Sequence, residues 1–234
     1  MVTIRRMESQ RARHHWTDWV GIIFFLGLAV TVLLKAPVVG FMISPILLYD
    51  VVVGISFLLR QPAKAKLEGW MPCIATYGNA FLIQTFVAFA SSRHPSWVVR
   101  TPVPWAFKGG VSIWLIGLTF NICAVWYFRR WFSISPQARE LVRTGPYRLA
   151  RHPIYATQVL MCIGILLAHF TLPLAVVILV SMGLLSARVH YEEIVLESAF
   201  PEYAEYRRQV GLFGPKLFSV GTANEKPAEV PPAA

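Results

Sequence analysis

Two short polar motifs, one on each side of a long apolar block, hold the residue types that are best suited to chemistry. The first contains Tyr147 and the run 151–155 (RHPIY), and the second contains Arg188 with the pair Glu192 and Glu193. A carboxylate can pair with an ammonium group, and an imidazole or guanidinium can bind a carboxylate. Together these groups are suited to bind a small zwitterionic molecule.

The spacing of the motifs predicts that they meet. The apolar block from Pro153 to Ala187 is too long for one membrane span of about 20 residues. Thr171-Leu172-Pro173 near its middle predicts a tight turn between two helices. Such a hairpin returns to the side of the membrane where it began, so we expect His152 to lie near Arg188 and Glu192. If the second helix continues past Arg188, these last two residues share one face.

His152 is predicted to lie at a helix N-terminus. Pro153 follows it, and proline is well suited to the first position of a helix because its missing N–H would have no partner there. Free backbone N–H groups at such an end can bind a carboxylate or a phosphate. Arg148 and Arg151 add positive charge beside it.

Each of these residues also has an ordinary structural explanation. His152 can be a helix cap, the arginines can be membrane anchors, and the two glutamates can be a solvated helix face. Because the residues occur together at this spacing, we favour a functional role for His152, Tyr155, Arg188 and Glu192. The roles of Arg148, Arg151 and Glu193 stay open between the two explanations.

The composition indicates a membrane protein. Of the 234 residues, 56% are hydrophobic and 15% are charged, whereas a soluble domain has about 25% charged residues. The net charge of +10 comes from residues between apolar blocks, so membrane orientation explains it better than a nucleic-acid partner, which we do not expect. Three cysteines without a CxxC pair are interpreted as buried hydrophobic residues, so no metal site is expected.

The apolar blocks predict about six membrane spans in an all-α, polytopic helix bundle. The expected spans lie at about Trp19–Leu34, Val38–Leu59, Trp70–Ala90, Gly110–Phe128 and, as a pair, within Pro153–Ala187. With the N-terminus placed inside, 18 of the 22 Lys and Arg residues fall on the cytoplasmic side, which predicts that both termini are cytoplasmic.

Three regions follow from this division. Residues 1–128 hold the first four helices, residues 129–218 hold the hairpin with a cytosolic pocket, and residues 219–234 are rich in Pro, Ala and Glu. We expect this last region to be a disordered tail.

The order of the motifs resembles the isoprenylcysteine carboxyl methyltransferase family and its relatives, which include phospholipid N-methyltransferases. The matching residues are Gly145-Pro146-Tyr147, the run 151–155, Arg188 with Glu192-Glu193, and the stretch from Phe200 to Tyr206. The resemblance covers about residues 130–215. The chain departs from the family at Phe200-Pro201, where the family often has phenylalanine-glycine.

The resemblance implies a methyltransferase that binds S-adenosylmethionine in a cytosolic pocket capped by the C-terminal segment. The residues that it implies for cofactor binding are Tyr147, His152, Pro153, Ile154, Tyr155 and Glu192. Arg188 would orient the substrate and so take part in catalysis. A carboxylate nucleophile needs only alignment by such a cation, whereas an amine or thiol would need a proton acceptor such as Glu193 or His190.

Several alternatives stay open at this point. The methyl acceptor is a prenylcysteine carboxylate, a phospholipid amine or another membrane amphiphile, and the oligomeric state is not predicted. A membrane reductase that binds a reduced nicotinamide cofactor and a non-catalytic membrane protein are the competing functions. Asp50 inside the second span is a functional candidate by default, but we favour a bond to a neighbouring helix through Tyr49, Asn79, Gln84 or Asn121.

Overall fold

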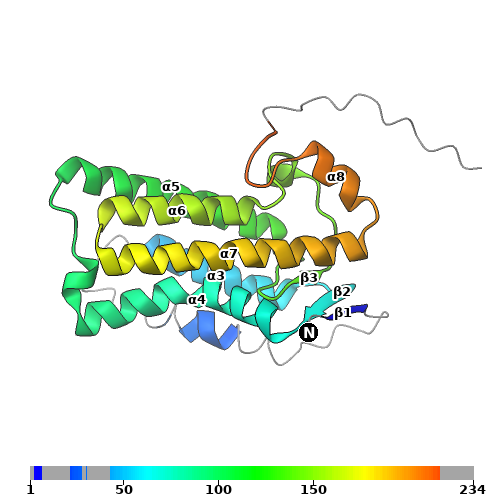
Figure 1. The fold of residues 1–234 in the computed structure, drawn as a ribbon, viewed down its shortest axis with the longest axis horizontal. Helices are drawn as coiled ribbons and strands as arrows, with labels where there is room; N and C mark the ends of the chain where they lie inside the picture. The colour runs from blue at the N-terminus through cyan, green and yellow to red at the C-terminus, as the bar shows by residue number, and fades with distance from the viewer. Residues whose placement is uncertain (1–2, 7–21, 28–29, 31–42, 217–234) are drawn as a thin grey trace, which may run out of the picture.

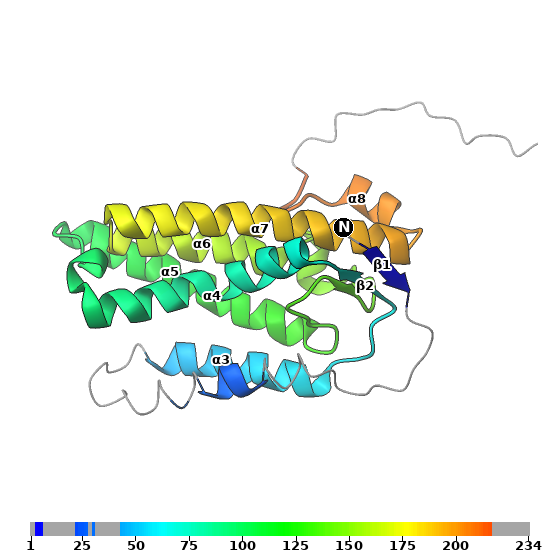
Figure 2. The same cartoon turned by 60° about the horizontal axis from the view of Figure 1, so that its bottom comes forward.

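The computed structural model describes residues 3–6, 22–27, 30 and 43–216. In this part of the chain, long helices lie side by side along one axis (Figure 1). They are α3 (Ile43–Leu59), α4 (Trp70–Arg93), α5 (Pro104–Phe128), α6 (Pro153–Ala168) and α7 (Leu172–Ala199). α5 packs along α6, and α4 packs along α7. Figure 2 shows α3 as a separate layer on the far side of the bundle from α7.

Three of the described helices, α4, α5 and α7, are long and apolar enough to cross a membrane. α6 and the segment Pro45–Leu59 of α3 are apolar but shorter. The prediction of a mostly helical chain with apolar helices able to span a membrane is therefore confirmed. The count of six spans and the side on which the termini lie stay predictions. Most of the first predicted span, the start of the second and the tail from residue 219 lie outside the described residues.

The predicted hairpin is confirmed at its predicted turn. α6 ends at Ala168 and α7 begins at Leu172, with Pro173 in its first turn. The turn is held from outside the hairpin, because Thr171 Oγ1 donates a hydrogen bond to the carbonyl of Trp97 (2.6 Å). α7 then runs without interruption to Ala199, which places Arg188 and Glu192 one helical turn apart, as expected.

Glycines allow α5 and α6 to approach each other closely. A Cβ atom added at Gly110 would lie 2.5 Å from the backbone nitrogen of Ala168 and 2.6 Å from the carbonyl oxygen of Gly164. The same atom at Gly117 would collide with Met161 at 2.8 Å. Small residues at a helix interface let two backbones meet in this way in a membrane. This contact sets the position of α6, which begins at the candidate site.

A small antiparallel sheet, which the all-α prediction did not include, lies at one end of the bundle. Its strands are β1 (Thr3–Arg6), β2 (Ala65–Glu68) and β3 (Gln137–Ala138), in the order β1-β2-β3. Thr3 pairs with Glu68, and Ala65 pairs with Ala138. The strands are too short to show a period-2 pattern, and they pair over long sequence separations, so the sequence did not reveal them.

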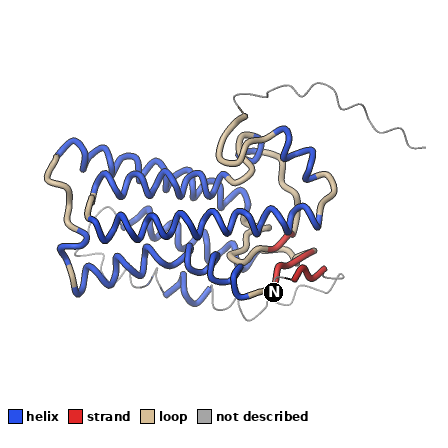
Figure 3. The backbone as a smooth tube through the Cα atoms, viewed as in Figure 1, coloured by secondary structure: helices blue, strands red, loops and turns tan. Residues whose placement is uncertain are grey.

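The sheet lies beside the C-terminal part of α7, and the short helix α8 (Tyr203–Gln209) lies on the other side of α7 in Figure 3. Its buried side chains pack against those of α7 and α8 in one hydrophobic cluster. The cluster is made of Ala65, Leu67, Ala138, Val195, Phe200, Tyr203 and Tyr206. The sheet thereby joins the N-terminal strand, the loop before α4 and the loop after α5 to the end of the bundle that holds the predicted site residues.

Candidate functional site

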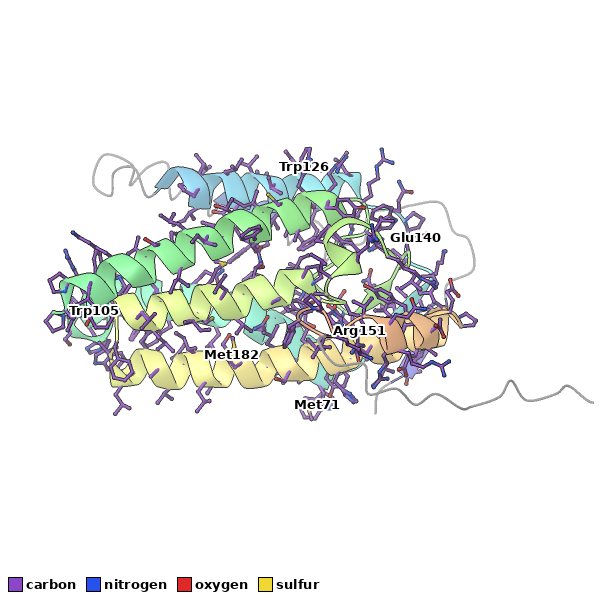
Figure 4. The ribbon with its side chains drawn as sticks, turned by 90° about the horizontal axis from the view of Figure 1, so that it is seen from above. Met71, Trp105, Trp126, Glu140, Arg151 and Met182 are labelled. Atoms are coloured by element: carbon purple, nitrogen blue, oxygen red, sulfur yellow. The ribbon has the colours of Figure 1, made fainter. Side chains whose placement is uncertain are left out.

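A cavity of about 690 Å³ extends from the α8 end of the bundle into the space between the helices. Its wall is formed by parts of α3, α4, α5, α6 and α7, by the loop 131–142, and by α8. Figure 4 shows Arg151 and Glu140, which both line the cavity, at one end of the bundle and Trp105 at the opposite end. A cavity of this size is in the usual range for small-molecule sites in proteins.

The hairpin brings the two polar motifs together at that end. His152 Nδ1 lies 3.8 Å from Glu192 Oε2, and His152 Nε2 lies 3.4 Å from Glu193 Oε1. Only 6% of His152 is exposed. The sequence prediction that an imidazole at the start of one helix meets a carboxylate at the end of the next is therefore met by the structure.

Glu192 is the centre of a partly buried polar group. Arg188 Nε lies 3.4 Å from Glu192 Oε1, and the hydroxyl of Tyr155 donates a hydrogen bond to the same oxygen. The guanidinium carbon of Arg188 lies 4.9 Å from the centre of the Tyr155 ring, and Arg188 Nη2 donates a hydrogen bond to the carbonyl of Ser133 (3.4 Å). These contacts fix both charged groups, because each has a partner on a different element.

Glu193 belongs to a second network, which holds α8 against α7. The carboxylate of Glu193 pairs with Arg151 and accepts a hydrogen bond from the Tyr203 hydroxyl (3.2 Å). Arg151 Nη1 also donates to that hydroxyl (3.3 Å), and Arg207 Nε lies 4.0 Å from Glu193. Arg151 and Glu193, whose roles the sequence left open, therefore connect the start of α6 to the C-terminal helix.

Tyr147 lies in the 3-10 helix η3 (Gly145–Arg148) and is buried against α5. Gly145 has a φ of +58°, and a Cβ there would meet the ring of Tyr127 at 2.6 Å, so this position requires glycine. The ring of Tyr147 lies 5.1 Å from that of Phe128, and its carbonyl accepts a hydrogen bond from Tyr206 (2.6 Å). Burial raises the pKa of Tyr147 well above its ordinary value and that of Tyr206 to about 12. Both hydroxyls therefore stay neutral at physiological pH.

The helix N-terminus at Pro153 is less open than the sequence suggested. The backbone N–H of Arg151 donates to the carbonyl of Gly211 (2.9 Å), and that of His152 donates to the carbonyl of Leu212 (3.0 Å). The expectation that free N–H groups gather beside His152 is therefore wrong for these two groups. They hold the chain after α8 in place, and the imidazole of His152 faces the two glutamates.

The structure brings together all but one of the residues implied for the site. Those that line the cavity are Tyr147, His152, Ile154, Tyr155, Arg188 and Glu192. Pro153 opens α6 as predicted, but it is not among the described residues that form the cavity wall.

Other residues of the wall were not identified from the sequence. On α6, the wall continues from Tyr155 through Gln158, Met161, Cys162 and Ile165. This spacing is one face of a helix, so helical periodicity from Tyr155 onward would have identified these residues. Arg139 and Ser133 come from the loop after α5, and no sequence signal placed them there.

Asp50 also lines the cavity, on α3 and outside the two motifs. Only 1% of it is exposed, and its Oδ2 atom has no hydrogen-bond partner in the part of the chain that the structure describes. For this oxygen, the bond to a neighbouring helix that we favoured is therefore not observed.

Comparisons with known proteins agree with the position of the site. Residues 105–203 match the phospholipid methyltransferase family. The chain is 36% identical over 93 residues to the cobalt-zinc-cadmium resistance protein CzcN of Cupriavidus metallidurans. This alignment covers 38% of this chain and 43% of the relative. It is 27% identical over 117 residues to the nickel-cobalt-cadmium resistance protein NccN of Alcaligenes xylosoxydans xylosoxydans, over 48% of this chain and 53% of the relative.

The chain thus spans about half the length of the curated relatives that it matches. No solved structure matches it significantly. The matched segment runs from the start of α5 to the start of α8 and includes every residue of the two motifs. The match of residues 105–203 to the phospholipid methyltransferase family agrees with the resemblance seen in the sequence.

Proposed function

We propose that the chain is an integral membrane methyltransferase that uses S-adenosylmethionine and acts on an amphiphilic acceptor held in the bilayer. One observation carries this proposal. A single cavity has the Arg188, Glu192 and His152 side chains at one end and continues between apolar helices at the other. Such a cavity suits the reaction of a charged soluble cofactor with a molecule that enters from the lipid.

The residues of the site fit the chemistry of this cofactor, which supplies a methyl group on a sulfonium. Glu192 is suited to pair with the ammonium group of the cofactor, and His152 is suited to bind its carboxylate. Tyr147 offers an aromatic surface beside these groups for the adenine or the sulfonium. We expect Tyr155 to be a positioning residue, because its hydroxyl is bound to Glu192 and its ring already lies against Arg188 and His152.

Arg188 is suited to orient the acceptor. It is 5% exposed, and it lines the cavity between the Glu192 end and the apolar part. Alignment of the nucleophile with the methyl carbon is the main contribution of a protein to an in-line transfer. A carboxylate acceptor such as a prenylcysteine would need only the guanidinium for this alignment.

An amine or thiol acceptor would also need a group that accepts its proton. His190 is exposed and is not among the described residues of the cavity wall. Glu193 has its carboxylate bound by Arg151 and Tyr203. The described geometry therefore favours a carboxylate as the reacting group at this end. Because most of the basic residues lie on the predicted cytoplasmic side, we expect the site to face the cytoplasm.

Calorimetry on the purified protein in lipid nanodiscs tests the proposal. S-adenosylhomocysteine, the demethylated product, should bind, and Glu192→Ala should weaken its binding at least 100-fold because the ammonium loses its carboxylate. Glu197→Ala is the matched control, since Glu197 is an exposed glutamate on the same helix that pairs with Arg207. Binding of reduced nicotinamide dinucleotide phosphate instead would support the reductase, and binding of neither compound would contradict both enzymes.

A further inference from the structure

Beyond Arg188 and Tyr155, the cavity wall contains polar side chains whose oxygen atoms lack hydrogen-bond donors. These atoms are Asp50 Oδ2, Asn79 Oδ1, Asn121 Oδ1 and Gln158 Oε1, and all four residues line the same cavity. They come from four different helices, α3, α4, α5 and α6. Asp50 and Asn121 are each 1% exposed, and Asn79 is 8% exposed.

The orientation of two of the amides follows from their partners. Asn121 Nδ2 donates to the backbone carbonyl of Ile154 (3.0 Å) and to Thr157 Oγ1 (2.7 Å). Asn79 Nδ2 donates to the backbone carbonyl of Ser181 (3.2 Å) and to its hydroxyl (3.3 Å). A carbonyl only accepts hydrogen bonds, so each NH₂ group must face it and each amide oxygen must point away from it. The unpaired oxygens are therefore a consequence of how the amides are anchored.

A buried polar atom without a partner is costly. An unsatisfied acceptor costs about 1–3 kcal/mol, and an unpaired carboxylate costs more. These four oxygens come from the helices α3 to α6, whereas the unpartnered buried nitrogens of the same wall, on Arg139, Arg151 and His152, come from the loop after α5 and the start of α6. A group that donates hydrogen bonds satisfies these four oxygens best, whereas a carboxylate or a phosphate diester would bring further acceptors and negative charge to them.

The hydrogen-bond partners of Asn121 and Asn79 show where these two residues lie along the bundle. Asn121 is bound to Ile154, close to the start of α6, whereas Asn79 is bound to Ser181. Ser181 precedes Arg188 by seven residues on α7, which corresponds to about 10 Å along a helix. Polar acceptors therefore continue from the site end into the apolar part of the cavity.

We propose that Asp50, Asn79, Asn121 and Gln158 form a second subsite for the acceptor. This subsite binds a hydrogen-bond-donating group, a hydroxyl or an ammonium, on the apolar body of the acceptor, up to about 10 Å deeper than Arg188. The inference rests on the proposed function, because it assumes that the methyl acceptor occupies this cavity. Asp50 and Asn79 lie outside the matched segment 105–203. The subsite therefore restricts the choice of acceptor through residues on the N-terminal helices α3 and α4.

Photo-crosslinking in nanodiscs tests the subsite. The probe is a dodecanol that carries a diazirine on its chain, and mass spectrometry follows its attachment to the cavity residues Met161 and Cys162. Four dodecyl compounds compete with it: dodecanol, dodecylamine, dodecyl methyl ether and dodecyltrimethylammonium. We expect each donor to compete at a concentration at least tenfold lower than its methylated counterpart. Equal potency within both pairs, as water-filled acceptors would give, overturns the proposal.

The comparison of dodecanol with dodecylamine shows which donor the subsite prefers. If the acceptor carries an ammonium, dodecylamine competes best. Asp50→Asn should then weaken competition by dodecylamine at least tenfold and leave competition by dodecyl methyl ether unchanged. If it carries a hydroxyl, dodecanol competes best, and Asn79→Leu weakens it. Ser56→Ala is the matched control, because Ser56 is a buried polar residue of α3 whose hydroxyl donates to Val52 and which is not part of the cavity wall. If neither Asp50→Asn nor Asn79→Leu changes the headgroup preference, the proposed subsite is contradicted.

Binding of S-adenosylhomocysteine, measured in parallel, separates this inference from the proposed function. Asp50→Asn should bind this compound like the wild type, which also shows that the variant is folded. Cofactor binding without any headgroup preference contradicts the subsite alone. A headgroup preference without cofactor binding in the wild type contradicts the proposed methyl transfer and leaves the subsite standing.

Discussion

Two carboxylates line the same cavity in opposite surroundings. Glu192, at the α8 end, is held by Arg188, Tyr155 and His152, whereas Asp50, on α3, has an oxygen with no partner among the described residues. The contrast shows which charges the fold itself compensates. The Glu192 end is organised before any ligand arrives, and the Asp50 region is completed only by what enters the cavity.

The largest effect should distinguish these two carboxylates directly. Arg188→Ala leaves Glu192 partly buried without its main cation, so the free energy of unfolding should fall by about 3 kcal/mol. Asp50→Asn removes a charge that has no observed partner, so it should leave stability unchanged or raise it. Reversible unfolding in detergent, followed by circular dichroism, measures both. A destabilisation by Asp50→Asn as large as that by Arg188→Ala would abolish the contrast.

The next effect tests how α6 is positioned for the Glu192 end. Gly110→Ala places a methyl group on the backbone of α6, so overpacking should cost about 1–3 kcal/mol and shift the start of α6 relative to α7. Gly109→Ala is the matched control, because a Cβ at Gly109 meets no atom within 4 Å. The same unfolding experiment, together with affinity for S-adenosylhomocysteine, measures the effect. Equal behaviour of the two variants would show that the close α5–α6 contact is not needed.

A smaller effect should come from the C-terminal helix that closes the Glu192 end. Tyr206→Phe removes the hydrogen bond to the carbonyl of Tyr147, which contributes about 1 kcal/mol. We expect a loss of cofactor affinity of up to about tenfold, measured by calorimetry, and no change in the headgroup preference of the Asp50 region. Tyr191→Phe, a tyrosine-to-phenylalanine change on α7, is the control. A change in headgroup preference would show that the two regions are coupled.

The smallest effect is expected at the surface beside the same end. Lys64 Nζ lies 3.5 Å from Glu140 Oε2, and both side chains are about half exposed. An exposed ion pair contributes little, so Lys64→Ala should change stability by less than about 0.5 kcal/mol. Cofactor affinity should stay within twofold of the wild type in the calorimetric assay. A larger loss would mean that this pair, and not only the buried contacts, organises the Glu192 end.

The amino-acid pattern was sufficient for the hairpin and for the meeting of His152 with Glu192. Both follow from local rules: a block too long for one span must turn back, proline and threonine mark where it turns, and residues four apart share a helix face. The segment after Phe200 was also expected over the site, and Tyr203 and Tyr206 line the cavity.

Other features depend on contacts between distant segments, which no local pattern encodes. The small sheet joins residues 3–6, 65–68 and 137–138. The carbonyls of Gly211 and Leu212 take the N–H groups that were expected to be free beside His152. The position of Asp50 on the cavity wall depends on how α3, α4, α5 and α6 pack around one cavity. The physical reason is that helical periodicity tells which residues share a face, whereas the packing of whole helices decides which faces meet and which polar atoms are left without partners.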